Sequence, residues 1–138
     1  MLRGIPPILS PQLFKILMEM GHGDEIVLAD GNFPAASTAR RLVRADGHGV
    51  APLLEAVLRF FPLDEHVAHP AILMAAEQEK PEIWNEYEQL LAAADAREGI
   101  TECIERHSFY ARAKEAYAVV ATGETAAYAN IILKKGVV

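Results

Sequence analysis

The chain has 138 residues, of which 51% are hydrophobic and 23% are charged, which predicts one folded domain spanning residues 1–138. Nineteen acidic and 13 basic residues give a net charge of −6, which argues against a nucleic-acid partner and against an anionic membrane surface. The single cysteine, Cys103, excludes an intrachain disulfide and a multi-cysteine metal site. No apolar run reaches the roughly 20 residues of a membrane span, and the first residues lack the features of a signal peptide, so we expect a cytoplasmic protein.

The first elements have clear boundary signals. Ser10 can cap a helix that has Pro11 in its first turn and ends at Gly21. Residues 25–30 are a short β-branched run typical of a buried strand, and this run ends in Asp30 before a Gly-Asn turn.

The rest of the chain is predicted to alternate between helices and strands. Helices are predicted over 35–41, 51–61, 81–96 and 108–116, and strands over 42–47, 71–77, 100–106, 116–124 and 130–136. Cys103 alternates within one of these strands, so we expect it to be packed rather than nucleophilic, and Lys134-Lys135-Gly136 is expected to be a solvated end. Strands that alternate with helices predict an α/β sheet covered on both faces.

Two polar residues flank the first predicted strand. His22 lies between two glycines, which leave its imidazole accessible for proton transfer near neutral pH, although a surface-loop histidine would show the same pattern. Asp30 ends the strand, where an α/β sheet collects ligands, and it can also simply form an Asx turn.

Two later segments carry further candidates. Arg106, followed by His107, Phe109 and Tyr110, comes directly after a predicted strand, where it either donates to a ligand or begins an ordinary helix. Tyr128 and Asn130 can stack on a ligand and bond its hydroxyls, or can pack as a strand begins.

Several familiar chemistries lack their signatures. The sequence has no P-loop, no Gly-x-Gly-x-x-Gly, no HExxH and no Gly-x-Ser-x-Gly, and His66 and His69 are interpreted as loop residues. The remaining groups suit acid–base chemistry on a neutral polyol, or simple binding, without a cofactor or metal.

In several short segments the sequence resembles the fucose mutarotase and ribose pyranase (RbsD/FucU) family, and its fucose branch in particular. The segments are Leu9-Ser10-Pro11, Met20–Ile26, Asp30, Asn32–Ala35, Arg44–Gly47, Glu105-Arg106, Phe109-Tyr110, Arg112-Ala113, Ala121–Ala126, Tyr128, Asn130 and Leu133–Val137. Each segment is short, but their order and spacing extend over nearly the whole chain.

The resemblance implies a three-layer α/β/α fold with a central mixed sheet, and interconversion of the α and β anomers of a free sugar, L-fucose in the fucose branch. It implies no cofactor and no metal. It also implies a ring-shaped homo-oligomer, often a decamer of two pentamers, with each site near a subunit boundary.

The same resemblance implies roles for individual residues. His22 is similar to the family's catalytic acid, and Asp30, Arg106, Tyr128 and Asn130 are similar to its sugar-binding residues. Tyr128 is in addition expected to stack on the ring or relay a proton.

Two positions depart from the fucose branch. His107 and Ala129 resemble the ribose form, so a D-ribose pyranase remains as an alternative. A non-catalytic sugar-binding or regulatory protein is a second alternative, because it would carry the same hydroxyl-binding residues. Phe33 and Trp84 are possible apolar walls of the site, although Trp84 also fits a packed helix stripe.

Overall fold

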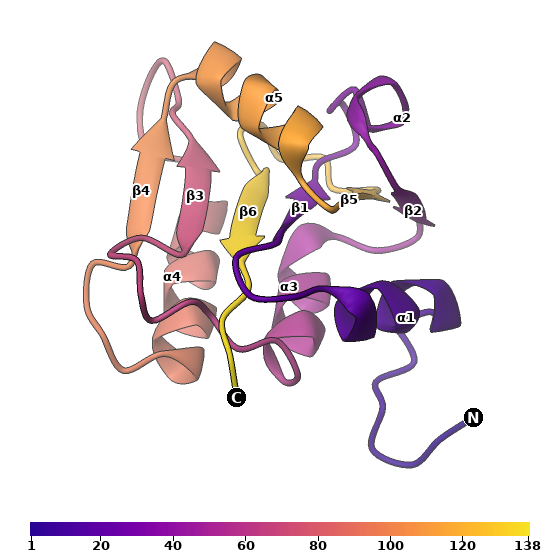
Figure 1. Ribbon diagram of the computed structural model, residues 1–138. Helices are drawn as coiled ribbons and strands as arrows, with labels where there is room; N and C mark the ends of the chain where they lie inside the picture. The colour runs from indigo at the N-terminus through magenta and orange to yellow at the C-terminus, as the bar shows by residue number, and fades with distance from the viewer.

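The computed structural model describes all 138 residues as one six-stranded sheet between two layers of helices (Figure 1). The strands are β1 (Glu25–Ala29), β2 (Leu42–Ala45), β3 (Ala71–Met74), β4 (Thr101–Ile104), β5 (Ala118–Thr122) and β6 (Ile131–Lys134). The helices are α1 (Pro11–Glu19), α2 (Ala35–Thr38), α3 (Val50–Leu58), α4 (Ile83–Ala94) and α5 (Arg106–Glu115). Every predicted element is therefore present, and the α/β prediction is confirmed.

The sheet is mixed because one strand runs against the others. The strand order is β2-β5-β1-β6-β3-β4, and only the pairs that include β6 are antiparallel. The five parallel strands consequently end at one edge, which we call the carboxyl edge, and β6 begins there. Along the β1–β6 pair, Leu28 lies opposite Ile131 near this edge, and Glu25 lies opposite Lys134 near the other.

Side chains at alternate strand positions pack into two separate hydrophobic cores, one on each face of the sheet. On one face, Ile26 and Leu28 of β1 join a cluster with the apolar residues of α1, α3 and α4. On the other face, Val27 and Ala29 join a smaller cluster with α2 and α5. Figure 1 shows α3 and α4 on the far side of the sheet and α5 on the near side. The sheet is thus buried on both faces, as its mostly parallel strands require.

The ends of two helices follow local rules. The Ser10 hydroxyl accepts a hydrogen bond from the Leu13 N–H at 3.1 Å, with Pro11 as the first helical residue of α1. The Glu105 carboxylate accepts from the N–H groups of His107 and Ser108 at the start of α5. These bonds lower the pKa of Glu105 although burial alone would raise it.

Two expectations about the surface were wrong. Cys103 is exposed rather than packed, because the helix layers bury the inner strands such as β3 but leave all four residues of the edge strand β4 exposed or half-buried. The Lys134–Gly136 segment is built into the fold rather than solvated: Gly136 is buried, and its N–H donates to the Pro62 carbonyl at 2.7 Å. No helix has both the length and the apolar character that crossing a membrane would require.

Candidate active site

The carboxyl edge brings Asp30 and Asn130 together. The Asp30 N–H donates to the Asn130 side-chain oxygen at 2.7 Å, and both residues are buried. Asp30 also accepts from the Asn32 N–H at 3.0 Å, so the Asx turn, which was the alternative role for this residue, is present. Asp30 lines a cavity of about 290 Å³ together with Phe33 and Thr122. Asp30 is therefore both a turn residue and a wall of a small cavity.

Helix α4 supports the segment that leads into β6. The indole N–H of Trp84 donates to the Tyr128 carbonyl at 2.8 Å, and the Tyr87 hydroxyl donates to the Ala129 carbonyl at 2.7 Å. Tyr87 is fully buried, and burial raises the pKa of its phenol, so the hydroxyl remains a neutral donor. Tyr128 has a φ of 54°, a left-handed conformation that is uncommon for residues other than glycine. Trp84 is thus packed beneath the segment, as its helix stripe indicated.

Arg106 lies at the same edge but apart from this group. It is exposed at the first residue of α5, and its side chain makes no hydrogen bond or ion pair. The strand that precedes it, β4, is three strands away from β1. Tyr110 of the same helix comes closer, because its ring packs 5.5 Å from that of Phe33 (centroid to centroid). Tyr110 is a site candidate that the sequence placed only within a larger motif.

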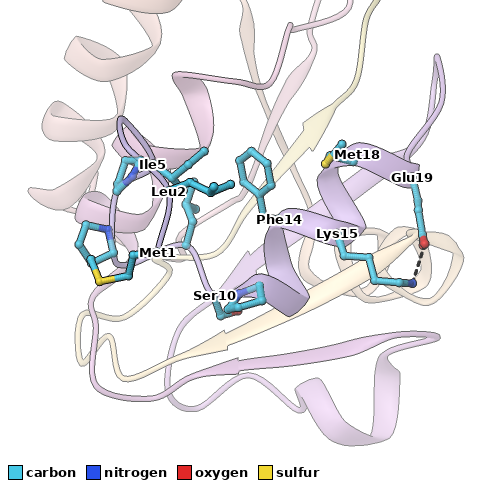
Figure 2. Close-up of a pocket in the computed structure, with 12 residues that line it drawn as sticks. Met1, Leu2, Ile5, Ser10, Phe14, Lys15, Met18 and Glu19 are labelled. Carbon is cyan, nitrogen blue, oxygen red and sulfur yellow. Dashed lines mark ion pairs between the residues drawn. The ribbon is translucent and has the colours of Figure 1, made fainter.

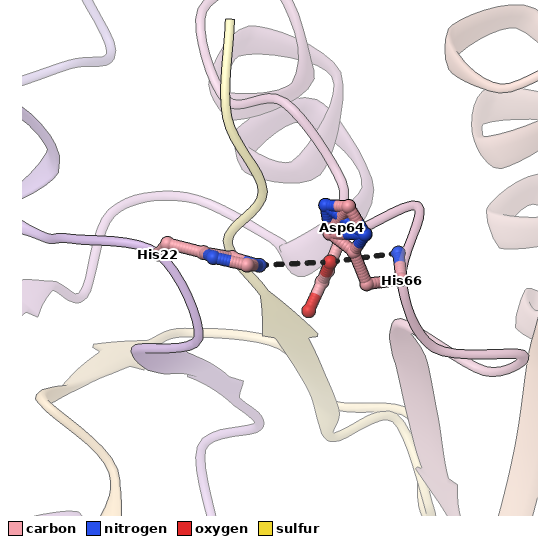
Figure 3. Close-up of side chains that lie close together, drawn as sticks. All are labelled: His22, Asp64 and His66. Atoms are coloured by element: carbon pink, nitrogen blue, oxygen red, sulfur yellow. Dashed lines mark hydrogen bonds and ion pairs between the residues drawn. The ribbon is translucent and has the colours of Figure 1, made fainter.

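His22 lies at the opposite edge of the sheet, where it contacts a carboxylate that the sequence did not single out. Its Nε2 is 3.1 Å from Oδ1 of Asp64, and the ring of His66 lies beside it (Figure 3). The Asp64 side chain is 3% exposed, whereas that of His22 is 45% exposed. Burial alone would raise the pKa of Asp64, but hydrogen bonds from the His66 N–H and from His22 outweigh it and lower that pKa. Asp64 therefore stays ionised and orients the imidazole.

The Lys134–Gly136 segment joins the two loops that carry this pair. The Gly23 N–H donates to the Lys135 carbonyl at 2.8 Å, which fixes the His22 loop. The Asp64 N–H donates to the Lys134 carbonyl at 3.0 Å, which fixes the other. A Cβ on Gly136 would lie 2.6 Å from the Leu63 carbonyl oxygen, so the close approach of these strands needs a glycine here.

Arg97 clamps the Asp64 loop from the outside. Its guanidinium donates to the carbonyls of Asp64 and Val67, each at 3.0 Å, and pairs with Asp95 at 2.8 Å. The side-chain hydrogen bond between Arg97 and Asp95 lowers the pKa of Asp95, so the pair remains charged. One side chain thus donates hydrogen bonds to two backbone carbonyls of a loop that has no regular secondary structure.

A larger hollow lies elsewhere in the molecule. It measures about 800 Å³ and lies between the N-terminal segment and α1 (Figure 2). Met1, Leu2 and Phe14 make it mainly apolar, and its two charged residues, Lys15 and Glu19, are paired with each other. It contains no acid–base group free for catalysis, so the chemistry belongs to the smaller sites.

The candidate residues therefore form two half-sites at opposite ends of β6. Asn130 precedes the strand and Lys135 follows it, five residue steps apart, which at about 3.3 Å per residue is roughly 17 Å. Asp30, Tyr128 and Asn130 lie at one end, and His22 with Asp64 at the other. A single monosaccharide cannot contact both ends within one chain.

Comparison with known proteins identifies the family of this chain. Residues 3–138 match the model of the RbsD / FucU transport protein family. The chain belongs to this family. It is 51% identical to the human fucose mutarotase, over 99% of this chain and 94% of the human protein. It is 50% identical to the L-fucose mutarotase of Haemophilus influenzae, over 99% and 97% of the two chains.

Solved RbsD/FucU structures give the same fold. The fucose mutarotase of Streptococcus pneumoniae, solved in complex with L-fucose, superposes with a TM-score of 0.96 at 49% identity, and covers 99% of each chain. Bacillus subtilis RbsD, solved in complex with D-ribose, has a TM-score of 0.75 at 26% identity over 94% and 95% of the chains. The expected RbsD-like fold is therefore confirmed, and the chain is more similar to the fucose-type relatives than to this ribose-type one.

Proposed function

We propose that this protein is an L-fucose mutarotase that interconverts the α and β anomers of the free sugar. The observation that carries the proposal is full-length identity of about 50% to fucose mutarotases, one of them solved with L-fucose on the same fold. The oriented histidine–carboxylate pair supplies the acid–base group that the reaction needs. The unpaired, exposed Cys103 is compatible with a reducing compartment such as the cytoplasm.

The chemistry opens and recloses a hemiacetal. A base removes the proton of the anomeric hydroxyl while an acid protonates the ring oxygen, and the C1–O5 bond breaks to give the open-chain aldehyde. Rotation about the C1–C2 bond and reclosure, with the proton transfers reversed, give the other anomer. No covalent intermediate forms, and a positioned proton-transfer group contributes about 10²–10⁴-fold.

His22 is the proton-transfer group in this scheme. When its Nε2–H donates to Asp64, the Nδ1 lone pair is free to take a proton from the sugar. The Asp64 carboxylate also stabilises the imidazolium formed after that transfer, which makes Asp64 a positioning residue. Protonated His22 then returns a proton as the ring closes.

Asp30, Tyr128, Asn130 and Arg106 bind the sugar in this proposal. The first three are held at the carboxyl edge by the buried bonds described above, so their positions are fixed before the sugar arrives. Arg106 is exposed and unpaired, so its five donors are free for sugar hydroxyls. Tyr128 has the additional role of stacking on the sugar ring or relaying a proton.

The separation of the half-sites requires a second copy of the chain. We place His22 and Asp64 of one copy against the sugar-binding half-site of its neighbour, which makes the subunit contact heterologous. A heterologous contact forms a ring when the rotation between neighbours closes, and we propose a closed ring here. The positioned groups then converge on one sugar without any change in either chain. A ring-shaped homo-oligomer is also what the family resemblance implies.

Saturation-transfer NMR on L-fucose tests the activity directly. The protein should accelerate exchange between the anomers, His22→Gln should return exchange to the uncatalysed rate, and folding should persist. D-Ribose serves as the comparison sugar, since a ribose-type enzyme would accelerate its exchange and leave L-fucose unchanged. Tight L-fucose binding without faster exchange would show a binding protein and contradict the proposal.

Mixing two inactive variants tests the shared site. His22→Gln and Asp30→Asn should each be inactive alone. In rings assembled from equal amounts of both, about a quarter of the sites should combine an intact His22 with an intact Asp30 from the neighbour. If each site were built within one chain, the mixed rings would have no intact site and no activity.

A further inference from the structure

Outside the sugar chemistry, His22, Asp64 and His66 form a cluster with the composition of a metal site. Each offers one ligand atom, and these atoms all lie within 4.8 Å of one another (Figure 3). We propose that this cluster binds Zn²⁺ and that the bound ion switches the protein off. The binding is independent of the proposed function, whereas the inhibition rests on it.

The spacing of the ligand atoms suits a bound ion. Zn²⁺ bonds to imidazole nitrogen and carboxylate oxygen at about 2.0–2.2 Å, which places neighbouring ligand atoms of a tetrahedral site roughly 3.3–3.6 Å apart. His22 Nε2 and Asp64 Oδ1 are already 3.1 Å apart. The His66 ring is 5.1 Å from the His22 ring (centroid to centroid), on an exposed side chain. Rotation of one exposed side chain therefore completes the triad.

The donor set also favours this ion. Two imidazoles and one carboxylate, with a fourth position open to water, are ligands typical of zinc. The carboxylate is held in place before the metal arrives, because Asp64 is buried and the Arg97 guanidinium fixes its backbone. Both histidines are exposed on the single chain, and in the assembly the opening that admits the sugar to His22 also admits the ion.

Zinc at this position would disable His22. The ion takes the Nε2 lone pair, so the single N–H proton of the neutral imidazole moves to Nδ1. Nδ1 is the nitrogen that must accept the sugar's proton, and in this tautomer it has no free lone pair. Asp64 exchanges its hydrogen bond for a metal bond, and proton transfer stops.

His66 separates metal binding from catalysis. Its one hydrogen bond to Asp64 comes from the backbone N–H, at 2.9 Å, and its ring lies beside that of His22 without a hydrogen bond, so the side chain neither transfers the proton nor orients His22. His66→Asn keeps that N–H and removes the metal ligand. His69→Asn is the matched control, because His69 is also an exposed loop histidine but bonds the Gly99 carbonyl instead.

The test uses the intact oligomer after removal of adventitious metal with a chelator. Calorimetric titration with Zn²⁺ should give one site per chain, and Co²⁺ should give the visible absorption bands of a site with nitrogen ligands. Zn²⁺ should suppress L-fucose exchange at the same occupancy. His66→Asn should exchange anomers at the wild-type rate but bind Zn²⁺ at least about tenfold more weakly, and His69→Asn should behave as the wild type.

Wild-type Zn²⁺ affinity in His66→Asn, or no stoichiometric binding to the wild type, would overturn the site. Stoichiometric binding with unchanged exchange would overturn the inhibition. A protein that binds Zn²⁺ through His66 but never accelerates sugar exchange would support the metal site and refute the proposed function instead, so the two failures are distinguishable.

Discussion

Replacing Tyr87 with phenylalanine tests how α4 holds the sugar-binding segment. The hydroxyl of this fully buried residue donates to the Ala129 carbonyl at 2.7 Å, and Ala129 is itself fully buried. Tyr87→Phe removes only the oxygen and leaves that carbonyl without a partner and without access to water. Such a loss costs about 1–3 kcal/mol of unfolding free energy.

For a domain of this size, about 4 °C of melting temperature corresponds to 1 kcal/mol, so Tyr87→Phe should lower the melting temperature by roughly 4–12 °C. Tyr117→Phe is the matched control, because its hydroxyl bonds the exposed Glu19 carboxylate at 3.2 Å. Surface changes of that kind stay within about 0.5 kcal/mol. Differential scanning calorimetry compares the two variants.

The same variant should affect sugar binding more than the proton transfer. Ala129 lies between Tyr128 and Asn130, so a loosened segment should raise KM for L-fucose, with a smaller change in kcat. Equal melting temperatures for Tyr87→Phe and Tyr117→Phe would refute the reasoning about the buried carbonyl. An unchanged KM in a destabilised Tyr87→Phe would refute the link between α4 and the site.

Three further substitutions test residues that hold the His22 site and the fold in place. Asp64→Asn should lower the exchange rate at least about tenfold in the NMR assay, because His22 loses its orienting charge, and wild-type rates would contradict this role. Because the folded pKa of Asp64 is lowered, its contribution to stability is present above its unfolded pKa of 3.8 and is lost as the pH falls through the lower folded value. The stability gap between wild type and Asp64→Asn should therefore shrink below about pH 4 in acid titrations followed by circular dichroism. Gly123→Ala should fail to fold or melt far lower, since its Cβ would lie 2.1 Å from the Asp46 carbonyl oxygen. Arg97→Gln should lower kcat more than it raises KM, since it acts through the Asp64 loop, and a change in KM alone would count against that role.

Local signals were sufficient to predict the elements of this fold. The Ser10 cap, the β-branched run of β1 and the apolar stripe of α4 each depend on neighbours in sequence, and the structure has all three. The strand order was not predictable, because the central place of β6 depends on contacts between distant residues. For the same reason the solvated end expected at Lys134–Gly136 was wrong.

The site was predictable only in part. The sequence placed His22 and Asp30 at opposite ends of one predicted strand, yet nothing in it indicated which side chains each would meet there. Asp64 was missed because a lone aspartate after Phe61-Pro62-Leu63 has no motif around it. The one available signal was a charged residue directly after an apolar stretch, which predicts either a turn or a buried carboxylate with a partner.

The central position of β6 also determines when the molecule can fold during synthesis. Strands β2, β5 and β1 form one half of the sheet and β3 and β4 the other, and only β6 joins them. Residues 131–134 leave the ribosome after all the other strands, so until then β1 and β3 each lack a neighbour on the side where β6 will lie. Such edges invite pairing with other chains, so the nascent protein depends on late and rapid insertion of one four-residue strand.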